Sequence, residues 1–348
     1  MKKATILMIG NYLSSPRHNR NVWHGLSERL PELGWHVITT SSKEMQSVRL
    51  LDMLLTVIRQ RKDYSLAQID VFSGRAFVFA EWCSFCLRML NKPIVLTLHG
   101  GRLPEFAKRF PKRVARLLNH AKIVVTPSPF LQKVLMPFRD DICVIPNPID
   151  LSASIFRVRE KAAPKLIWVR AFHEIYNPGL APKVIKALAL YFPDVHLLMV
   201  GPDKGDGSLE KIKAIAKDLH IEDKVEIIGG VEHHEIPTWL DKADIFINTT
   251  NYDTSPRSLL ESMANGLYCV STNVGGIPYL IEDRKSGLLV APNDPNDMAD
   301  AIRLIINNTE ISKIISHNAR KKAEGFNWST ILEMWDDLFT KVISQSNE

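Results

Sequence analysis

Short apolar runs alternate with helical stretches along almost the whole chain, and this alternation constrains the fold more than any other feature. Thr5–Ile9 is an apolar run of strand length, residues 22–33 have helical spacing, and Trp35–Thr40 resumes as a strand. Consecutive strand–helix–strand units build a parallel sheet that is covered by helices on both faces. We therefore predict an α/β fold.

The alternation occurs twice, which indicates two Rossmann-like domains. A chain of 348 residues is too long for one ordinary core. The turn-forming segment Pro146–Asp150 and the charged stretch 157–165 interrupt the pattern, and Leu166–Val169 starts it again. The expected parts are an N-terminal domain over 1–160, a C-terminal domain over 161–326, and a helix over 327–348 that packs back toward the N-terminal domain.

The composition excludes several classes of protein. Hydrophobic residues make up 45% of the chain and charged residues 24%, as in proteins that fold in water. The longest apolar runs, such as Ala76–Ala80, fall far short of the roughly 20 residues of a membrane span. Four cysteines, at positions 83, 86, 143 and 269, lack the second pair that a structural zinc site needs. We expect a cytoplasmic protein that binds no metal.

Positive charge is concentrated in the first half of the chain. Residues 1–160 carry 24 Lys and Arg against 12 Asp and Glu, although the net charge of the whole chain is only +6. Segment 104–122 interleaves basic and apolar residues, which predicts a basic amphipathic face. Such a face is either solvated or bound to anionic membrane lipid, with the protein then peripheral at the inner face of the membrane. No nucleic-acid-binding module accompanies the charge, so we expect no nucleic acid partner.

The strongest candidate site follows the strand-like run Ile245–Asn248. Parallel sheets bind ligands at the carboxyl ends of their strands. Here a loop ends in Ser255, which we expect to cap a helix whose first residue is Pro256, leaving backbone N–H groups free for a phosphate. Glu261 lies inside this helix, and Ser258 and Glu261 alternatively form a capping box with no ligand role.

This region resembles the family 4 retaining glycosyltransferases. Asp253 and Glu261 have the family's spacing of two acidic residues with seven between them, and the run 261–278, ESMANGLYCVSTNVGGIP, matches its most characteristic stretch. The likeness spans nearly the whole chain and is strongest over 165–295. It implies the GT-B fold, in which two Rossmann-like domains face each other across a cleft, the N-terminal one on the acceptor side and the C-terminal one binding the nucleotide sugar.

The resemblance assigns the main donor contacts. It implies that Glu261 holds the donor ribose, that Asp253 meets the sugar ring, where the family usually has Glu, and that Arg170 binds the diphosphate. A guanidinium fork suits phosphate oxygens. The lysine that usually follows this arginine is absent, and Asn177, Lys204 or Arg257 is expected to replace it.

Further site residues lie at strand ends. His99 follows a strand, where the family commonly keeps a histidine near the donor sugar, although a lone histidine is as often structural. Gly10 and Asn11 are expected near the diphosphate, and the glycine pair of many relatives is missing from loop 14–19. The full expected donor site comprises Gly10, Asn11, Arg170, Asn177, Gly201, Gly230, Val231, Asp253, Thr254, Ser255, Pro256, Arg257, Ser258 and Glu261.

The resemblance implies transfer of a sugar, with retained configuration, from a UDP- or GDP-linked donor to a hydroxyl of a glycan or lipid-linked acceptor in cell-envelope glycan, polysaccharide or glycolipid synthesis. His99, Asp253 and Arg170 are the expected catalytic residues. We expect no cofactor, because Arg170 and helix N–H groups provide the positive charge that a cation would otherwise supply. The alternatives are a sugar-nucleotide epimerase of the same fold and a non-catalytic nucleotide-sugar-binding protein.

Overall fold

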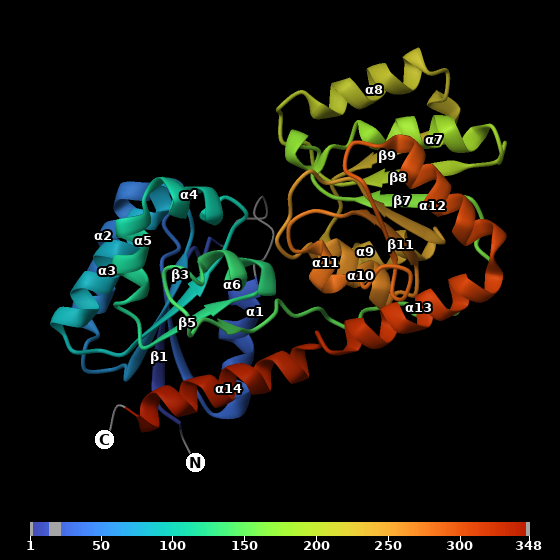
Figure 1. The fold of residues 1–348 in the computed structure, drawn as a ribbon. Helices are drawn as coiled ribbons and strands as arrows, with labels where there is room; N and C mark the ends of the chain where they lie inside the picture. The colour runs from blue at the N-terminus through green and yellow to red at the C-terminus, as the bar shows by residue number, and fades with distance from the viewer. Residues whose placement is uncertain (1–2, 14–21, 346–348) are drawn as a thin grey trace. The chain divides into compact units, whose positions relative to one another are not determined.

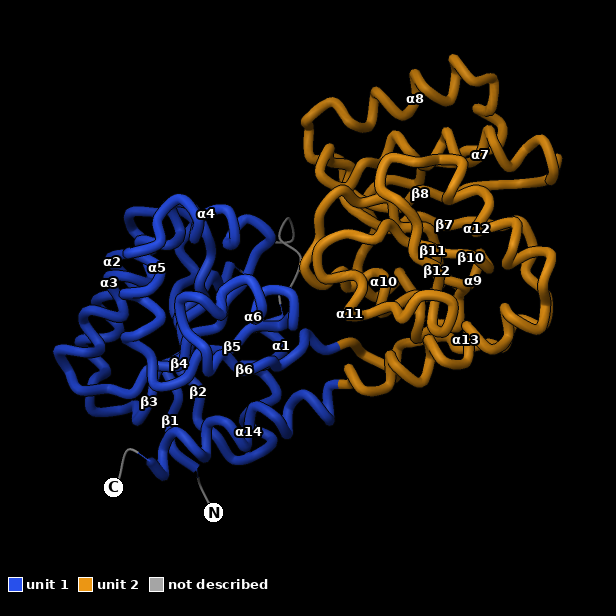
Figure 2. The backbone as a smooth tube through the Cα atoms, in the orientation of Figure 1, with its two compact units in different colours: residues 1–148, 328–348 blue, residues 149–327 orange. Residues whose placement is uncertain are grey.

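The chain divides into two compact units. The computed structural model describes residues 3–13 and 22–345. Unit 1 comprises residues 1–148 and 328–348, and unit 2 comprises residues 149–327 (Figure 2). Each unit has its own parallel six-stranded sheet with helices on both faces (Figure 1), so the predicted α/β class is confirmed.

Unit 1 is built on a sheet with the strand order β2-β1-β3-β4-β5-β6, and all of its pairings are parallel. The strands are β1 (Thr5–Ile9), β2 (His36–Thr40), β3 (Leu66–Val71), β4 (Ile94–Leu98), β5 (Ile123–Thr126) and β6 (Cys143–Val144). Strand β1 shows why both faces are covered. Leu7 and Ile9 point into one buried cluster and Ile6 and Met8 into another, as expected for side chains that alternate along a strand.

Helices cover both faces of this sheet. Those described in unit 1 are α1 (Val22–Arg29), α2 (Gln46–Arg59), α3 (Phe77–Met89), α4 (Leu103–Arg109), α5 (Pro111–Leu118), α6 (Pro129–Leu135) and α14 (Trp328–Ser344), with short 3-10 turns at Leu30–Leu33 and Gly74–Ala76. Helices α2 to α5 share a core with Leu7 and Ile9. Helices α1 and α14 pack on the opposite face, with Ile6 and Met8.

Unit 2 repeats the plan with the strand order β12-β11-β10-β7-β8-β9, again parallel throughout. The strands are β7 (Lys165–Val169), β8 (His196–Val200), β9 (Val225–Gly229), β10 (Ile245–Asn248), β11 (Tyr268–Thr272) and β12 (Leu288–Val290). The helices are α7 (Leu180–Ala189), α8 (Ser208–Asp218), α9 (Ile236–Asp241), α10 (Arg257–Ala264), α11 (Ile277–Leu280), α12 (Pro295–Asn307) and α13 (Thr309–Glu324), and 3-10 turns lie at Glu174–Tyr176, Glu222–Lys224 and His233–Glu235. Helices α7, α8 and α12 cover one face, and α10, α11 and α13 the other.

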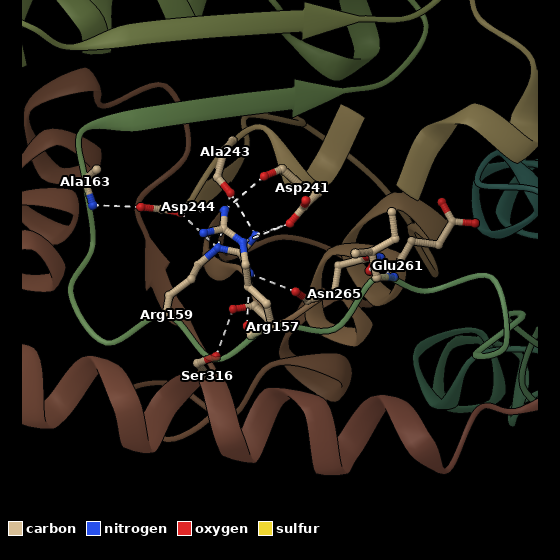
Figure 3. Close-up of polar contacts among 11 residues, drawn as sticks. Arg157, Arg159, Ala163, Asp241, Ala243, Asp244, Glu261, Asn265 and Ser316 are labelled. Carbon is tan, nitrogen blue, oxygen red and sulfur yellow. Dashed lines mark hydrogen bonds and ion pairs between the residues drawn. The ribbon is translucent and has the colours of Figure 1, made fainter. Parts of the chain in front are cut away.

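Segment 149–160, which the sequence suggested would lie with the N-terminal domain, belongs to unit 2. A buried arginine holds the chain there. The Arg159 side chain is only 1% exposed, and its guanidinium donates to the Asp244 carboxylate at 3.0 Å and to the carbonyl oxygens of Ala243 and Asn265 (Figure 3). The same carboxylate accepts from the Ala163 backbone N–H at 2.9 Å. A buried charge needs such complete pairing, which fixes this segment against unit 2.

Candidate active site

Arg170 stands directly after β7, at the carboxyl edge of the unit 2 sheet. Its side chain forms an ion pair with Asp253 and lies 4.4 Å from the centre of the Tyr176 ring. The Arg170 Nε atom is buried and has no partner. A side chain on Gly201 would overlap the Arg170 backbone oxygen, so the end of β8 must be glycine for the two strand ends to approach. Arg170 is therefore firmly placed and keeps an unused donor.

Asp253 lies in the loop between β10 and α10 and is buried. Its carboxylate also accepts from the Ser255 backbone N–H at 3.1 Å, and its backbone oxygen accepts from the Gly276 N–H at 2.8 Å. Gly275 has a φ of +55°, and a Cβ atom there would overlap the Asp253 backbone. The glycine pair in the run 261–278 thus allows the loop after β11 to hold Asp253 in place.

Helix α10 begins at Arg257, one residue later than the sequence suggested. Pro256 is the N-cap, in an extended conformation, and no side chain caps the helix. The expected cap by Ser255 is therefore wrong, and its hydroxyl is buried without a partner. The reason is that Pro256 has an extended backbone, with φ −68° and ψ 113°, and not the helical conformation of a first helical residue, so Ser255 lies one position too early to cap α10. The first N–H groups of α10 are left without a side-chain acceptor, as an anion site requires.

Glu261 points its carboxylate at two basic side chains. Arg257 Nε lies at 2.8 Å and His233 Nε2 at 3.2 Å, and the carboxylate is 16% exposed. It does not form a capping box at the start of α10. His233 was missed in the sequence, although its place four residues beyond β9 at the same sheet edge was a signal for it. Tyr176, under the Arg170 guanidinium, was missed because nothing local marks it.

The residues considered as replacements for the lysine differ in their surroundings. Arg257 is engaged with Glu261. The Asn177 side chain donates to the Asn293 side-chain oxygen at 2.9 Å. Lys204 is exposed and follows β8. Of the other expected donor contacts, Gly201 and Gly230 follow the neighbouring strands β8 and β9, with Val231 next to Gly230, while Thr254, Ser255, Pro256 and Ser258 surround the start of α10. Unit 2 thus brings its predicted residues to one sheet edge.

His99 follows β4 in unit 1 and is 8% exposed. Its Nε2 lies 3.0 Å from a carboxylate oxygen of Asp70, which also accepts from the Gln68 amide at 2.8 Å. The His99 ring stacks on Phe72, and the Trp23 ring lies close by, both at 5.2 Å between ring centres. Because a carboxylate oxygen accepts hydrogen bonds, the Asp70 contact suits His99 Nε2 as a donor.

Gly10 and Asn11 belong to the same cluster as His99. A side chain on Gly10 would overlap the second carboxylate oxygen of Asp70, and the Asn11 backbone oxygen accepts from the Trp23 indole N–H at 2.9 Å. Asp70 was not identified from the sequence, although an acidic residue inside an apolar strand run is costly to bury without a partner and so indicates a candidate site. Loop 14–19, where the family's glycine pair is missing, lies outside the described residues.

No group of three or more His, Cys, Asp or Glu side chains within residues 3–13 and 22–345 could hold a metal ion. Charged side chains at the unit 2 edge pair with each other: Arg170 with Asp253, and Glu261 with Arg257 and His233. The basic side chains and the start of α10 thus place positive charge at this edge.

Comparison with known proteins adds two family matches that together cover most of the chain. The model described as "Glycosyl transferases group 1" matches residues 157–322, and that described as "Glycosyltransferase Family 4" matches residues 20–153. An uncharacterized glycosyltransferase of Haemophilus influenzae is 30% identical over 44% of this chain and 42% of its own length. The chain thus spans less than half the length of this relative.

Solved structures share the fold over nearly the entire chain. Sucrose-phosphate synthase from Thermosynechococcus elongatus superimposes with a TM-score of 0.79 at 19% identity, covering 99% of this chain and all of that one. The Anabaena protein HepE, solved in complex with UDP and glucose, gives a TM-score of 0.77 at 18% identity over 97% of this chain and all of that one. At these identities the likeness shows the fold alone, and it confirms the two Rossmann-like units of the GT-B class.

Proposed function

Since the chain belongs to the family 4 glycosyltransferases, we propose that it transfers a sugar from a UDP- or GDP-linked donor to an acceptor hydroxyl with retention of configuration. The observation that carries this proposal is the arrangement at the carboxyl edge of the unit 2 sheet. Arg170, at the end of β7, pairs with Asp253 in the loop that leads into α10. A guanidinium and uncapped N–H groups suit the negative charge of a departing diphosphate.

The two carboxylates have separate roles in this proposal. Glu261, held by Arg257 and His233, accepts hydrogen bonds from the ribose hydroxyls, because a carboxylate offers acceptors only. Asp253 meets the hydroxyls of the sugar ring. While no donor is present, Arg170 neutralises Asp253. Binding of the diphosphate brings a second anion to this arginine, whose partly exposed guanidinium has five N–H donors and can contact both anions.

Unit 1 supplies the remaining contacts. As the resemblance implies, we assign Gly10 and Asn11 to the diphosphate and His99, whose ring contacts Asp70, to the sugar. Leaving-group charge is stabilised by Arg170 and the start of α10, so the proposed reaction needs neither metal nor cofactor. The HepE complex with UDP and glucose supports a UDP-linked donor within this proposal.

The proposed acceptor is a glycan or a lipid-linked intermediate in cell-envelope glycan, polysaccharide or glycolipid synthesis. Such an acceptor is met in the cytoplasm or at the inner face of the membrane, where nucleotide sugars are also present. The expected membrane contact of segment 104–122 belongs to this proposal, because that segment is basic and lies in unit 1.

The test compares nucleotide release from UDP- and GDP-sugars by the wild type and by Arg170→Ala and Glu261→Ala. Lys213→Ala and Glu210→Ala serve as matched controls, because these two side chains form an exposed pair on α8, also in unit 2. Loss of one charge-assisted contact is expected to lower kcat/KM by about 10- to 100-fold in the site variants, with the controls unchanged. Equal turnover in all five proteins would overturn the site.

The same incubation separates the competing functions. The anomeric proton of the product, followed by NMR, gives retention or inversion directly. An epimerised sugar nucleotide formed without acceptor would identify an epimerase instead. Tight nucleotide-sugar binding with neither release nor transfer to any cell-envelope extract would identify a non-catalytic binding protein.

A further inference from the structure

Helix α3 is apolar on both of its faces. Phe77, Cys83 and Leu87 point into the core of unit 1, whereas Trp82 and Phe85 are more than half exposed, at 53% and 52%. Met89, one turn further on, is 71% exposed. The spacing 82, 85 and 89 places the three exposed side chains on one side of the helix. A helix on the surface of a protein normally presents polar residues there, so this side is unusual.

The neighbouring helix α2 also carries exposed apolar side chains. It packs against α3 and shares the same core (Figure 1). Its outer side carries Val48, Leu51 and Ile58, each more than 40% exposed. We call the exposed side chains of these two helices the α2–α3 face. Large exposed apolar surfaces of this kind mark binding sites for proteins or membranes.

Basic side chains border the α2–α3 face. Arg88 lies on α3 beside the imidazole of His120, at 2.7 Å, and Lys112 and Arg116 are exposed on α5. A groove of about 320 Å³ brings the two kinds of residue together: it is lined by Trp82, Phe85, Glu81, Arg113, Arg116, Leu117 and His120. Over residues 43–122 there are 15 Lys and Arg against 6 Asp and Glu, so this part of unit 1 carries a net positive charge.

Segment 104–122 contributes mainly charge to this surface. Its apolar residues Val114, Leu117 and Leu118 are buried in the core of unit 1, and Phe106 and Phe110 are partly buried. Arg113 is also engaged, because its guanidinium binds both carboxylate oxygens of Glu81. The amphipathic pattern of 104–122 is thus explained by packing. The exposed large apolar side chains beside this segment belong to α3 and α2.

We propose that the α2–α3 face docks on an anionic lipid membrane, with Trp82, Phe85 and Met89 in the interface and Arg88, Lys112 and Arg116 on the lipid headgroups. Tryptophan favours the boundary between lipid tails and water. Each basic residue near an anionic surface strengthens binding by about fivefold. A second copy of the chain fits less well, since a twofold interface would bring the same basic residues against each other. None of the helices described is able to span a membrane, so the contact is peripheral.

Binding is measured by co-sedimentation with vesicles of neutral phosphatidylcholine and of phosphatidylcholine mixed with anionic phosphatidylglycerol. The anchor variant is Trp82→Ser with Phe85→Ser. Its matched control is Leu190→Ser with Ile314→Ser, two apolar residues in unit 2 that are more exposed than Trp82 and Phe85. The wild type and control are expected to bind the anionic vesicles, and the anchor variant to lose at least about tenfold in affinity. Unchanged Tm values show that all variants fold.

Two further measurements identify the mode of binding. Lys112→Gln with Arg116→Gln is expected to weaken binding and flatten its salt dependence, whereas Lys211→Gln with Lys217→Gln on α8 should do neither. Lipids brominated near the headgroup are expected to quench Trp fluorescence in the wild type, with less quenching in Trp82→Phe. Equal binding to neutral and anionic vesicles, or full binding by the anchor variant, overturns the proposal. A dimer that the anchor variant abolishes, without vesicle binding, overturns it in favour of a second copy.

The proposed membrane contact rests on the proposed function in one respect, which is that the acceptor is associated with a membrane. The vesicles contain no donor and no acceptor, so failure to bind them is distinct from failure to transfer a sugar. An enzyme that transfers sugar to a water-soluble acceptor and ignores the vesicles would retain the proposed function and lose this inference.

Discussion

At the scale of single residues, Asp70 is the side chain that holds His99 in place. Asp70→Asn removes the charge but keeps the shape, so His99 loses a charge-assisted hydrogen bond while the core around it is unchanged. Such a bond contributes about 1.5–3 kcal/mol. We therefore expect kcat for sugar transfer to fall by about 10- to 100-fold, with a smaller change in KM for the donor. Steady-state kinetics with a nucleotide sugar checks this.

The control for Asp70→Asn is Asp63→Asn, an exposed aspartate that precedes β3. It should leave both constants unchanged. If Asp70→Asn has full activity and unaltered thermal stability, the pairing with His99 has no role in the reaction. If stability alone falls, Asp70 is a structural residue and the proposed function of His99 loses its support.

The cysteines give a second prediction at this scale. Burial raises the pKa of the Cys83 thiol to about 12 and that of Cys269 further still, whereas Cys143 is exposed. Since only the thiolate reacts, a raised pKa keeps Cys83 and Cys269 protonated through neutral and mildly alkaline pH. We expect a thiol reagent at pH 8 to label Cys143 readily, and Cys83 and Cys269 only in denaturant. Mass spectrometry of the labelled peptides checks this, and rapid labelling of Cys83 in the native protein would contradict it.

At the scale of elements, the loop after β11 fixes the loop before α10. Gly275→Ala places a side chain at a φ of +55° against the Asp253 backbone. The left-handed conformation costs about 1–2 kcal/mol, and the enforced shift adds roughly 1–3 kcal/mol. Gly207→Ala is the matched control, because its φ of +84° is also positive but no atom lies within 4 Å of the added Cβ. We expect both changes to lower the free energy of unfolding, Gly275→Ala by the larger amount. Only Gly275→Ala is expected to weaken nucleotide-sugar binding, which calorimetry measures. Equal effects of the two changes would show that Asp253 does not depend on this contact.

The elements themselves were largely predictable, since the apolar runs at 5–9, 245–248 and 268–272 correspond to strands. The ends of these elements and the residues that pair between them were less predictable. The capping role of Ser255 was wrong because Pro256, not Ser255, precedes the helix directly. Asp70 and His233 were missed because their partners lie 29 and 28 residues away along the chain, at His99 and Glu261. Local spacing carries no information on which strand ends meet in the sheet.

At the scale of the whole molecule, the chain forms two cores, and the sequence predicted both from the repeated alternation. The division between them follows from packing that local patterns do not show. Segment 149–160 goes with unit 2 because Arg159 is buried against Asp244. Helix α14 goes with unit 1 because its apolar side, including Trp335 and Phe339, covers the sheet face formed by Ile6 and Met8.

This division predicts that unit 1 depends on the last helix for its stability. Phe339 is fully buried, so Phe339→Ala leaves a cavity and should cost about 3–5 kcal/mol. Met334→Ala on the same helix, at a 36% exposed position, should cost much less. Hydrogen exchange resolves the two units: in Phe339→Ala, amides of β1 and β3 are expected to exchange faster, while those of β10 and β11 keep their protection. A nucleotide diphosphate at about 100 times its Kd raises the free energy of unfolding of the unit that binds it by roughly 2.7 kcal/mol. We expect UDP or GDP to slow exchange in β10 and β11 of this variant without restoring β1. Uniform loss of protection across both sheets would show that the chain unfolds as one unit, with its two cores inseparable.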